Sequence, residues 1–229
     1  MNARYVITET PASLGEHFGI TIRDNFPARY NVAPSQPVPI IRPASGEGEG
    51  GGRTYGLVRW GFVPGWDRKG TFLKKAIVNI RSETAHEKPS FRNAWRRRHC
   101  LFPMNGAYEW VAEADGKQPF LIARDRSMPL FCLAGLWEEW MGEDGSEMTS
   151  AAFLTRPATG PLRALHHRVP VFVPEDRYDD WLDADETDDR LAREIIGLPP
   201  PDLVWWKVSR RVNSWKPDDP ELIEPIEAA

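Results

Sequence analysis

Short apolar runs separated by turn residues dominate the pattern of hydrophobic and polar positions along the chain. The runs are four to eight residues long and many are rich in β-branched and aromatic side chains, a pattern typical of strands. They predict strands at Arg4–Thr8, Pro37–Arg42, Tyr55–Phe62, Cys100–Met104, Ala107–Val111, Pro119–Ala123, Leu130–Leu136, Ser150–Thr155, Pro170–Val173 and Leu203–Val208.

Helical patterns are fewer, and each follows a capping or turn residue. Helices are predicted at Ala12–Phe18 after a Thr10-Pro11 cap, and at Ser90–Arg98, Pro174–Leu182 and Asp188–Ile196. The 21 prolines and 18 glycines indicate many turns between short elements. We therefore expect an α+β fold with a mixed, strand-rich core and peripheral helices. No linker-like break divides the chain, which predicts one domain over residues 1–229.

Two further segments bear on location and on phosphate binding. The longest apolar stretch, near Pro129–Trp137, is far shorter than the roughly 18 residues of a membrane span. The first residues lack the basic and apolar regions of a signal peptide, so a cytoplasmic protein without membrane contact is expected. The glycine-rich segment Gly46–Gly52 contains two glutamates that would repel phosphate, and a strand follows it, so it is interpreted as a hairpin connection.

The charge of the chain is distributed unevenly. The formal net charge is -4, but residues 1–110 carry 16 Lys and Arg against 9 Asp and Glu, whereas residues 111–229 carry 13 against 24. This asymmetry permits a positive groove on a net-negative protein. The two cysteines, Cys100 and Cys132, are too few for a disulfide framework and lack metal-binding spacing, so both are expected in the core.

Two polar motifs lie where a core alone would not require them. In Asn79-Ile80-Arg81-Ser82-Glu83-Thr84 the alternatives are a functional cluster and a helix-entry loop with capping groups. In Gly106-Ala107-Tyr108-Glu109-Trp110 a carboxylate lies between two aromatic residues of a predicted strand. If Glu109 is buried, it must be paired or protonated, and an ion pair with an arginine is the structural alternative to a catalytic role.

Two more motifs carry an imidazole and exposed aromatic rings. His166 and His167 are adjacent on a segment expected to be extended, so their side chains should point to opposite sides and at most one should enter a given site. Without further ligands at suitable spacing they do not form a metal site, whereas one imidazole can transfer a proton near neutral pH. Trp60 is expected in the core, and Trp66, beyond Pro64-Gly65, on the surface as a base-stacking platform.

Taken in order along the chain, these motifs resemble the SRAP family of SOS-response-associated peptidases and abasic-site-processing proteins. The resemblance rests on Arg4-Tyr5, Arg29-Tyr30-Asn31-Val32-Ala33-Pro34, Trp60-Gly61, Asn79-Ile80-Arg81-Ser82-Glu83-Thr84, Cys100-Leu101-Phe102-Pro103, Gly106-Ala107-Tyr108-Glu109-Trp110, Ala134-Gly135-Leu136-Trp137, Phe153-Leu154-Thr155, Leu165-His166-His167-Arg168-Val169-Pro170 and Val208-Ser209-Arg210-Arg211-Val212-Asn213. It implies a fold that binds single-stranded DNA, or a junction of single and double strands, at an abasic site. No cofactor, metal or obligate protein partner is implied.

The resemblance also assigns roles to residues. The usual nucleophile of the family is a cysteine at position 2, whose amine condenses with the abasic aldehyde and whose thiol then closes a thiazolidine. By motif matching, Asn79 would bind the opened sugar, Glu109 would orient or deprotonate the amine, and His166 would exchange a proton with the sugar oxygen. The DNA-binding residues would be Arg4 and Arg81 on flanking phosphates, Pro34 and Trp66 at neighbouring bases, and Arg168.

Position 2 departs from this pattern because it holds Asn2, and Ala3 replaces the usual glycine. An amide cannot close the thiazolidine, and the larger side chain should hinder methionine removal, which would displace the amine by up to about 3.6 Å. A hydrolysable Schiff base, with strand cleavage by β-elimination, remains open chemically. Three readings follow: an abasic-site processor without the usual crosslink, a non-covalent single-stranded DNA binding module, or a peptidase acting on its own N-terminus.

Overall fold

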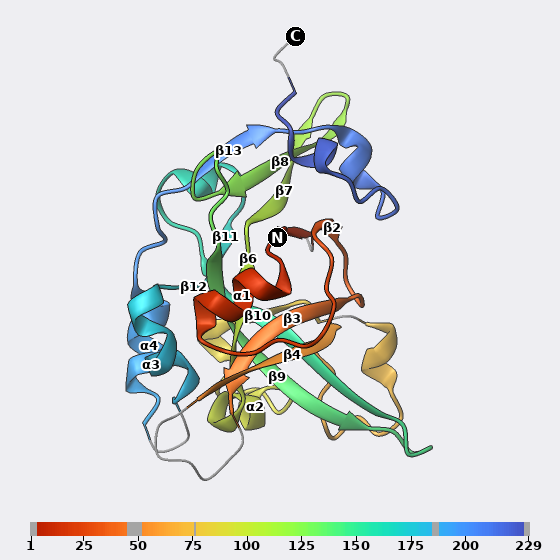
Figure 1. Ribbon diagram of the computed structural model, residues 1–229, viewed down its shortest axis with the longest axis vertical. Helices are drawn as coiled ribbons and strands as arrows, with labels where there is room; N and C mark the ends of the chain where they lie inside the picture. Colours follow the sequence, from red (N-terminus) through yellow and green to blue (C-terminus); the bar gives the residue numbers. More distant parts are fainter. Residues whose placement is uncertain (1–3, 45–51, 76, 185–187, 227–229) are drawn as a thin grey trace.

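The computed structural model describes residues 4–44, 52–75, 77–184 and 188–226, whose strands form two sheets (Figure 1). The smaller sheet has five strands in the order β13-β8-β7-β1-β2. Its strands are β1 (Tyr5–Ile7), β2 (Arg29–Val32), β7 (Gly106–Glu113), β8 (Gly116–Ala123) and β13 (Val204–Lys207).

The larger sheet has eight strands in the order β11-β10-β4-β3-β6-β9-β12, with β5 paired to β10. Its strands are β3 (Pro37–Pro43), β4 (Arg53–Trp60), β5 (Asn79–Arg81), β6 (His99–Met104), β9 (Phe131–Met141), β10 (Glu147–Pro157), β11 (Arg168–Pro170) and β12 (Phe172–Val173). Strand β10 runs parallel to β4 and β5 and antiparallel to β9, so this sheet is mixed. The additional pairing of β9 with β10 closes the sheet on itself around the main core.

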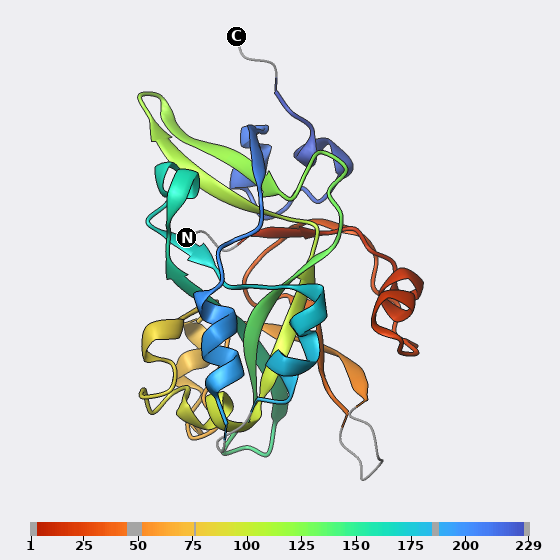
Figure 2. The same ribbon diagram turned by 90° about the vertical axis from the view of Figure 1, so that its left-hand side faces the viewer.

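Short helices lie around the sheets. The α-helices are α1 (Pro11–Phe18), α2 (Arg92–Arg97), α3 (Tyr178–Leu182) and α4 (Arg190–Gly197). The 3-10 helices are η1 (Thr71–Lys74), η2 (Ser82–Thr84), η3 (Gly160–Ala164), η4 (Glu175–Arg177), η5 (Arg210–Asn213) and η6 (Pro220–Ile223). Helices α3 and α4 pack side by side against one flank of the larger sheet, as both views show (Figures 1 and 2).

The two sheets bury separate apolar clusters, and β1 contributes to both. Side chains alternate along a strand, so Tyr5 and Ile7 enter the main core while Val6 enters the smaller one. Tyr5 meets the buried Trp60 edge to face, with ring centroids 5.0 Å apart. Since every residue of β1 is buried, the strand is fixed between the two clusters. It holds the residue before it, Arg4, at the boundary between the sheets.

The chain passes from the larger sheet to the smaller at Asn105, between β6 and β7. This buried side chain accepts a hydrogen bond from the Thr8 amide at 2.8 Å and donates to the Met128 carbonyl at 2.9 Å and to Glu9 Oε1 at 3.2 Å. A buried amide needs such partners because its desolvation is otherwise uncompensated. Asn105 therefore fixes the angle between β6 of the larger sheet and β7 of the smaller sheet.

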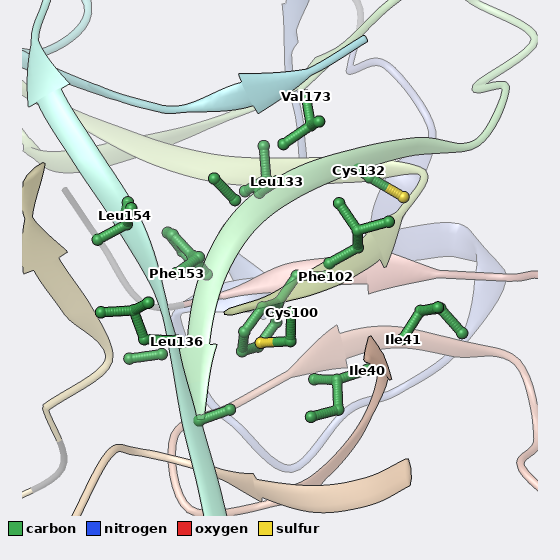
Figure 3. Packing of buried hydrophobic residues seen from close by; sticks show 14 of the residues in the cluster. Ile40, Ile41, Cys100, Phe102, Cys132, Leu133, Leu136, Phe153, Leu154 and Val173 are labelled. Carbon is green, nitrogen blue, oxygen red and sulfur yellow. The ribbon is translucent and has the colours of Figure 1, made fainter. Parts of the chain in front are cut away.

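Close packing at Gly135 shapes the wall of the main core, whose buried side chains include Phe102 and Phe153 (Figure 3). A Cβ at this position of β9 would lie 2.5 Å from the ring of Phe102, so a larger residue cannot fit without moving that ring. Phe102 in turn meets Phe153 edge to face, at 5.7 Å between centroids. Cys100 and Cys132 are also buried in this core, which confirms their predicted place.

The α+β class is confirmed, and the predicted strands and four helical segments are present with shifts of several residues at some ends, except that the single strand predicted at Pro170–Val173 is two strands, β11 and β12. Thr10 caps α1 by accepting from the Ser13 amide, as expected. Two strands were not predicted: β2, and β5, which occupies the start of the segment read as a helix-entry loop. The single-domain assignment stays a prediction, and nearly all of the predicted hairpin connection Gly46–Gly52 lies outside the described residues.

Within the described ranges, no helix is both long and apolar enough to cross a membrane. The helices of this part of the chain have at most eight residues.

One buried imidazole should make the stability of the fold depend on pH. His99 stacks on Trp181 with ring centroids 4.3 Å apart, and its Nδ1 donates to the Trp181 carbonyl at 2.8 Å. Its Nε2 has no partner among the described residues. Burial lowers the pKa of His99 to about 4. The folded state therefore resists protonation, whereas an unfolded histidine accepts a proton near pH 6.5.

We expect the free energy of unfolding to fall as the pH drops from about 6.5 to about 4, by up to roughly 3 kcal/mol from this group. Replacing His99 by Phe keeps an aromatic ring beside Trp181 and removes the titration, so urea unfolding of His99→Phe should show a weaker pH dependence. Replacing the exposed His167 by Gln serves as the control and should keep most of it. Equal slopes for His99→Phe and the wild type would contradict the assignment.

Candidate active site

A pocket lies where β1, β7 and the start of β11 meet. Its polar lining comes from Arg4 just before β1, Tyr108 and Glu109 on β7, His166 just before β11, and Arg168 at the start of β11. Apolar residues form most of the remaining lining: Met104, Ala107, Ile122, Phe131, Phe153, Leu162, Leu165, Val169, Pro170, Phe172 and Leu203. The low polarity of this lining strengthens electrostatic interactions among the polar groups inside.

The alternation of β7 explains why Glu109 faces this pocket. Tyr108 and Trp110 pack on the smaller core, so Ala107 and Glu109, on the other face of the strand, point toward the main core and the pocket. Glu109 is only 4% exposed, and its Oε1 accepts a hydrogen bond from the Trp110 amide at 3.3 Å. A carboxylate held this way is an acceptor for a proton or for an amine.

The contacts of His166 define its protonation state. Its Nδ1 lies 3.0 Å from the amide nitrogen of Arg168 and 3.3 Å from the carbonyl oxygen of the same residue. The shorter contact is to an N–H that can only donate, so Nδ1 carries the lone pair and the proton resides on Nε2. Burial lowers the pKa of His166, which also favours the neutral ring. At neutral pH this imidazole therefore offers a single N–H donor.

The adjacent histidines do not point to opposite sides, so that expectation was wrong. They lie in the turn between η3 and β11 and not on an extended strand, and their ring centroids are 4.1 Å apart. Only His166 lines the pocket, while His167 is exposed. The positive charges that His166 and His167 would carry oppose each other, and this neighbour lowers the pKa of His167.

Asn79 is not among the residues that line the pocket, but the pairing of β5 with β10 places it next to one of them. It is opposite Phe153, whose ring forms part of the pocket wall. Its side-chain Oδ1 is buried and has no hydrogen-bond partner among the described residues. An orphaned buried acceptor costs about 1–3 kcal/mol, so a hydrogen-bond donor on a ligand would remove a real penalty here.

Arg4 is held by the C-terminal segment. Its Nη1 donates to Asn31 Oδ1 at 2.7 Å, to the Val212 carbonyl at 3.0 Å and to the Ser214 carbonyl at 3.2 Å. Burial lowers its pKa, although an arginine remains charged at any ordinary pH. Arg4 therefore joins the pocket to a segment about 210 residues later in the chain.

Arg168 is engaged in a similar way. It forms a two-pronged ion pair with Glu83, at 2.7 and 2.8 Å, and donates to Thr155 Oγ1 and to the Thr155 carbonyl. The hydrogen bond from Arg168 lowers the pKa of Glu83 to about 2. This clamp fixes the backbone whose amide orients His166.

The remaining predicted residues are distributed around the pocket. Pro34 lines a separate open groove that it shares with Arg4. Arg81 is exposed at the end of β5, opposite Thr155. Trp66 is 55% exposed, as predicted, but it packs on Phe72 after β4 and lines neither the pocket nor the groove. Asn2 lies outside the described residues.

Sequence reasoning missed three contributors to the site. Asn31 and Glu83 orient the two arginines, and Trp215 lines the open groove with Arg4 and Pro34. Trp215 has a local signal, since it is a large aromatic among the polar residues Asn213-Ser214 and Lys216 in a turn-rich segment. The pairings of Asn31 and Glu83 have none, because each joins residues far apart in sequence.

The fold and the pocket define an α+β protein with a carboxylate and a neutral imidazole gathered beside its first strand. The chain belongs to the SOS response associated peptidase (SRAP) family, whose model matches residues 1–215. A crystal structure of a protein from Bacteroides thetaiotaomicron has the same fold, with a TM-score of 0.79 and 21% identity over 98% of this chain and 99% of that one. A protein from Bordetella bronchiseptica gives 0.75, with 28% identity over 90% and 99%.

Two curated relatives are similar over most of their length. The abasic site processing protein YoqW of Bacillus subtilis is 34% identical over 197 residues, which cover 85% of each chain. The abasic site processing protein YedK of Escherichia coli is 30% identical over 201 residues, covering 86% of this chain and 85% of the relative.

If Arg4 holds the C-terminal segment, Arg4→Gln should loosen residues 209–219. The substitution removes the guanidinium that donates to three acceptors. A hydrogen bond to a charged group contributes about 1.5–3 kcal/mol to stability. We expect amide hydrogen exchange in this segment to become at least about tenfold faster, measured by mass spectrometry. Arg81→Gln, which neutralises an exposed arginine, should leave the segment unchanged. Equal protection in Arg4→Gln and the wild type would contradict the anchoring role.

Proposed function

We propose that this chain recognises and processes abasic sites in single-stranded DNA, including sites at junctions of single and double strands. The observation that carries the proposal is the convergence of Glu109 and His166 on one largely apolar pocket beside Arg4. The relatives named as abasic site processing proteins support the same substrate.

The side chains suit attack of an amine on the aldehyde of a ring-opened abasic sugar. The amine must be neutral to attack, and Glu109 can accept its proton. The Nε2 proton of His166 can be donated as a hydrogen bond to the sugar oxygen, and the orphaned Oδ1 of Asn79 can accept one from a sugar hydroxyl. The carbinolamine then loses water to give an imine. Glu109 and His166 line the pocket that would hold the reacting carbon, and Asn79 is paired with Phe153 of the pocket wall, so no nucleobase is needed for this recognition.

Asn2 determines how far this chemistry proceeds. An imine formed by an amine is hydrolysable, and in the family's usual reaction the thiol of a cysteine at position 2 traps it as a thiazolidine. The carboxamide of Asn2 is not a comparable nucleophile. We therefore propose reversible capture, with recognition retained and without a heat-stable crosslink. The same missing thiol disfavours a peptidase that acts on its own N-terminus.

The second candidate is a binding module that holds abasic or single-stranded DNA with no covalent step. The observation that favours it is Asn2 itself, since loss of the thiol removes the step that makes capture permanent. The pocket geometry serves both functions, and they differ only in whether an imine forms.

Borohydride separates the two candidates, because it reduces an imine to a stable amine. We expect the wild-type protein, mixed with a single-stranded oligonucleotide carrying one abasic site, to give a protein–DNA adduct on a denaturing gel only when borohydride is added. An oligonucleotide with a tetrahydrofuran analogue lacks the aldehyde and should bind without forming an adduct. Binding should weaken as salt rises, since phosphate contacts contribute to affinity.

Glu109→Gln is the matched variant for this assay. It keeps the size of the side chain and removes the proton acceptor, so the trapped adduct should form at least about tenfold more slowly. Retained binding with no adduct from the wild type would favour the binding module. Equal binding to abasic and intact single-stranded DNA, with no adduct, would overturn abasic-site recognition, and a protein that binds neither DNA would overturn both candidates.

Restoring the thiol should restore permanent capture. We expect Asn2→Cys to give an adduct with abasic single-stranded DNA that survives heating without borohydride, because the thiol can close a ring on the imine carbon. Asn2→Ala is the control, since its small side chain equally favours removal of the methionine but offers no thiol. Intact mass spectrometry establishes the N-terminus of each protein. If Asn2→Cys, with its methionine removed, yields no heat-stable adduct, loss of the thiol alone does not account for the changed chemistry.

A further inference from the structure

Trp215 is an exposed tryptophan on a rigid segment beside the pocket. Its side chain is 60% exposed, the highest value among the large apolar residues that the structure describes as exposed. Exposed indole surface opposes stability, since burial of apolar area is favourable. Of the exposed large apolar residues in the described part of the chain, only Trp215 lines the groove that contains Arg4.

The backbone around Trp215 is anchored on both sides. The Ser214 carbonyl accepts hydrogen bonds from Arg4 and from Asn31 Nδ2, the latter at 2.9 Å, and the Pro217 carbonyl accepts from the same Nδ2 at 2.7 Å. Asn213 Oδ1 accepts from the indole N–H of Trp110 at 2.5 Å. The exposure of Trp215 is therefore a feature of a fixed segment and does not come from a loose loop.

The opposite wall of the groove is fixed as well. Ser35 has a left-handed backbone, with φ of 70°, and its Oγ accepts a hydrogen bond from Arg59 at 2.6 Å. Gln36 Oε1 accepts from the Ala33 amide at 2.9 Å and from Arg29 at 2.8 Å. A groove with two rigid walls can receive a flat group without reorganising, which reduces the entropic cost of binding.

Charge along this edge of the groove suits a polyanion. Arg4 lines both the groove and the pocket, so the two are adjacent. Lys216, next to Trp215, is exposed. The nearby carboxylates are paired: Asp218 with Arg29, and Asp219 with Arg211 at 2.7 Å. The carboxylates closest in sequence to Trp215 are thus neutralised by arginines.

We propose that Trp215 stacks on the base of a nucleotide next to the abasic site. This inference rests on the proposed function and adds a DNA-binding residue to it. When the abasic sugar occupies the pocket, the strand passes Arg4, and its neighbouring nucleotide enters the groove between Trp215 and the Pro34-Ser35 turn. Every base has an aromatic face, so Trp215 contributes affinity with little dependence on sequence. The abasic nucleotide itself has no base to stack, which makes contacts to its neighbours the means of holding the strand.

The experiment compares two oligonucleotides with the same length and charge. The first carries one tetrahydrofuran analogue between purine nucleotides, and in the second the nucleotides on both sides of the analogue also lack their bases. We expect Trp215→Ala to bind the first about 5- to 100-fold more weakly than the wild type, because stacking is lost. It should bind the second as tightly as the wild type does. Trp215→Phe should recover part of the loss, and fluorescence anisotropy of labelled DNA measures the affinity of each protein for each oligonucleotide.

Met141→Ala is the control, since Met141 is 45% exposed at the end of β9 and lines neither the pocket nor the groove. It should bind both oligonucleotides as the wild type does. Equal losses of Trp215→Ala on both oligonucleotides, or no loss on either, would overturn the stacking role while the proposed function stands. If the wild type does not prefer the first oligonucleotide to an intact strand of the same length, the proposed function fails and this inference fails with it.

Discussion

The hydrogen bonds of one arginine organise the site. Arg4 is the residue just before β1, and its guanidinium is bonded to Asn31 and to carbonyls of residues 212 and 214. These bonds join the start of the chain, the second strand and the C-terminal segment at one point. The pocket lies on one side of Arg4 and the groove on the other. Because β1 is buried on both faces between two cores, the position of Arg4 is set by packing, and the polar groups of the site are arranged around it.

Periodicity and turn residues were sufficient to predict most strands and the α+β class, because most strands here carry enough apolar residues to show the pattern. The two strands that escaped are short. β2 lies at the edge of the smaller sheet, where Asp218 accepts hydrogen bonds from the amides of Tyr30 and Asn31, and β5 owes its form to parallel pairing with β10. β5 pairs with a strand more than 70 residues away, and β2 pairs with β1 and is held at its outer edge by Asp218, about 190 residues away. No local pattern records such pairings, so their absence from the predictions has a physical cause.

The same distinction applies to the site. The alternation of side chains along β7 predicts that Glu109 lies on the other face of the strand from Tyr108 and Trp110. The chemistry of their side chains made His166 and Asn79 candidates for the site. Which tautomer His166 adopts could not be read from the sequence, because it depends on a turn that brings Nδ1 to the amide of Arg168. The expectation of an extended His166-His167 segment failed for this reason. The hydrogen-bond partners of Arg4 and Arg168 could not be predicted either, because an arginine in a sequence indicates a positive charge but not the acceptors that it binds.

The segments that form the site are far apart in the sequence, and this separation has a consequence for biosynthesis. β1 is made first, yet it pairs with β7 about a hundred residues later, and the carbonyls that hold Arg4 come at residues 212 and 214. Translation proceeds from the N-terminus at about 5–20 residues per second, so the wall beside the first strand is completed only seconds after that strand leaves the ribosome. The first strand of a nascent chain is therefore present before the pocket beside it is complete, and the site is assembled as one of the last events of folding.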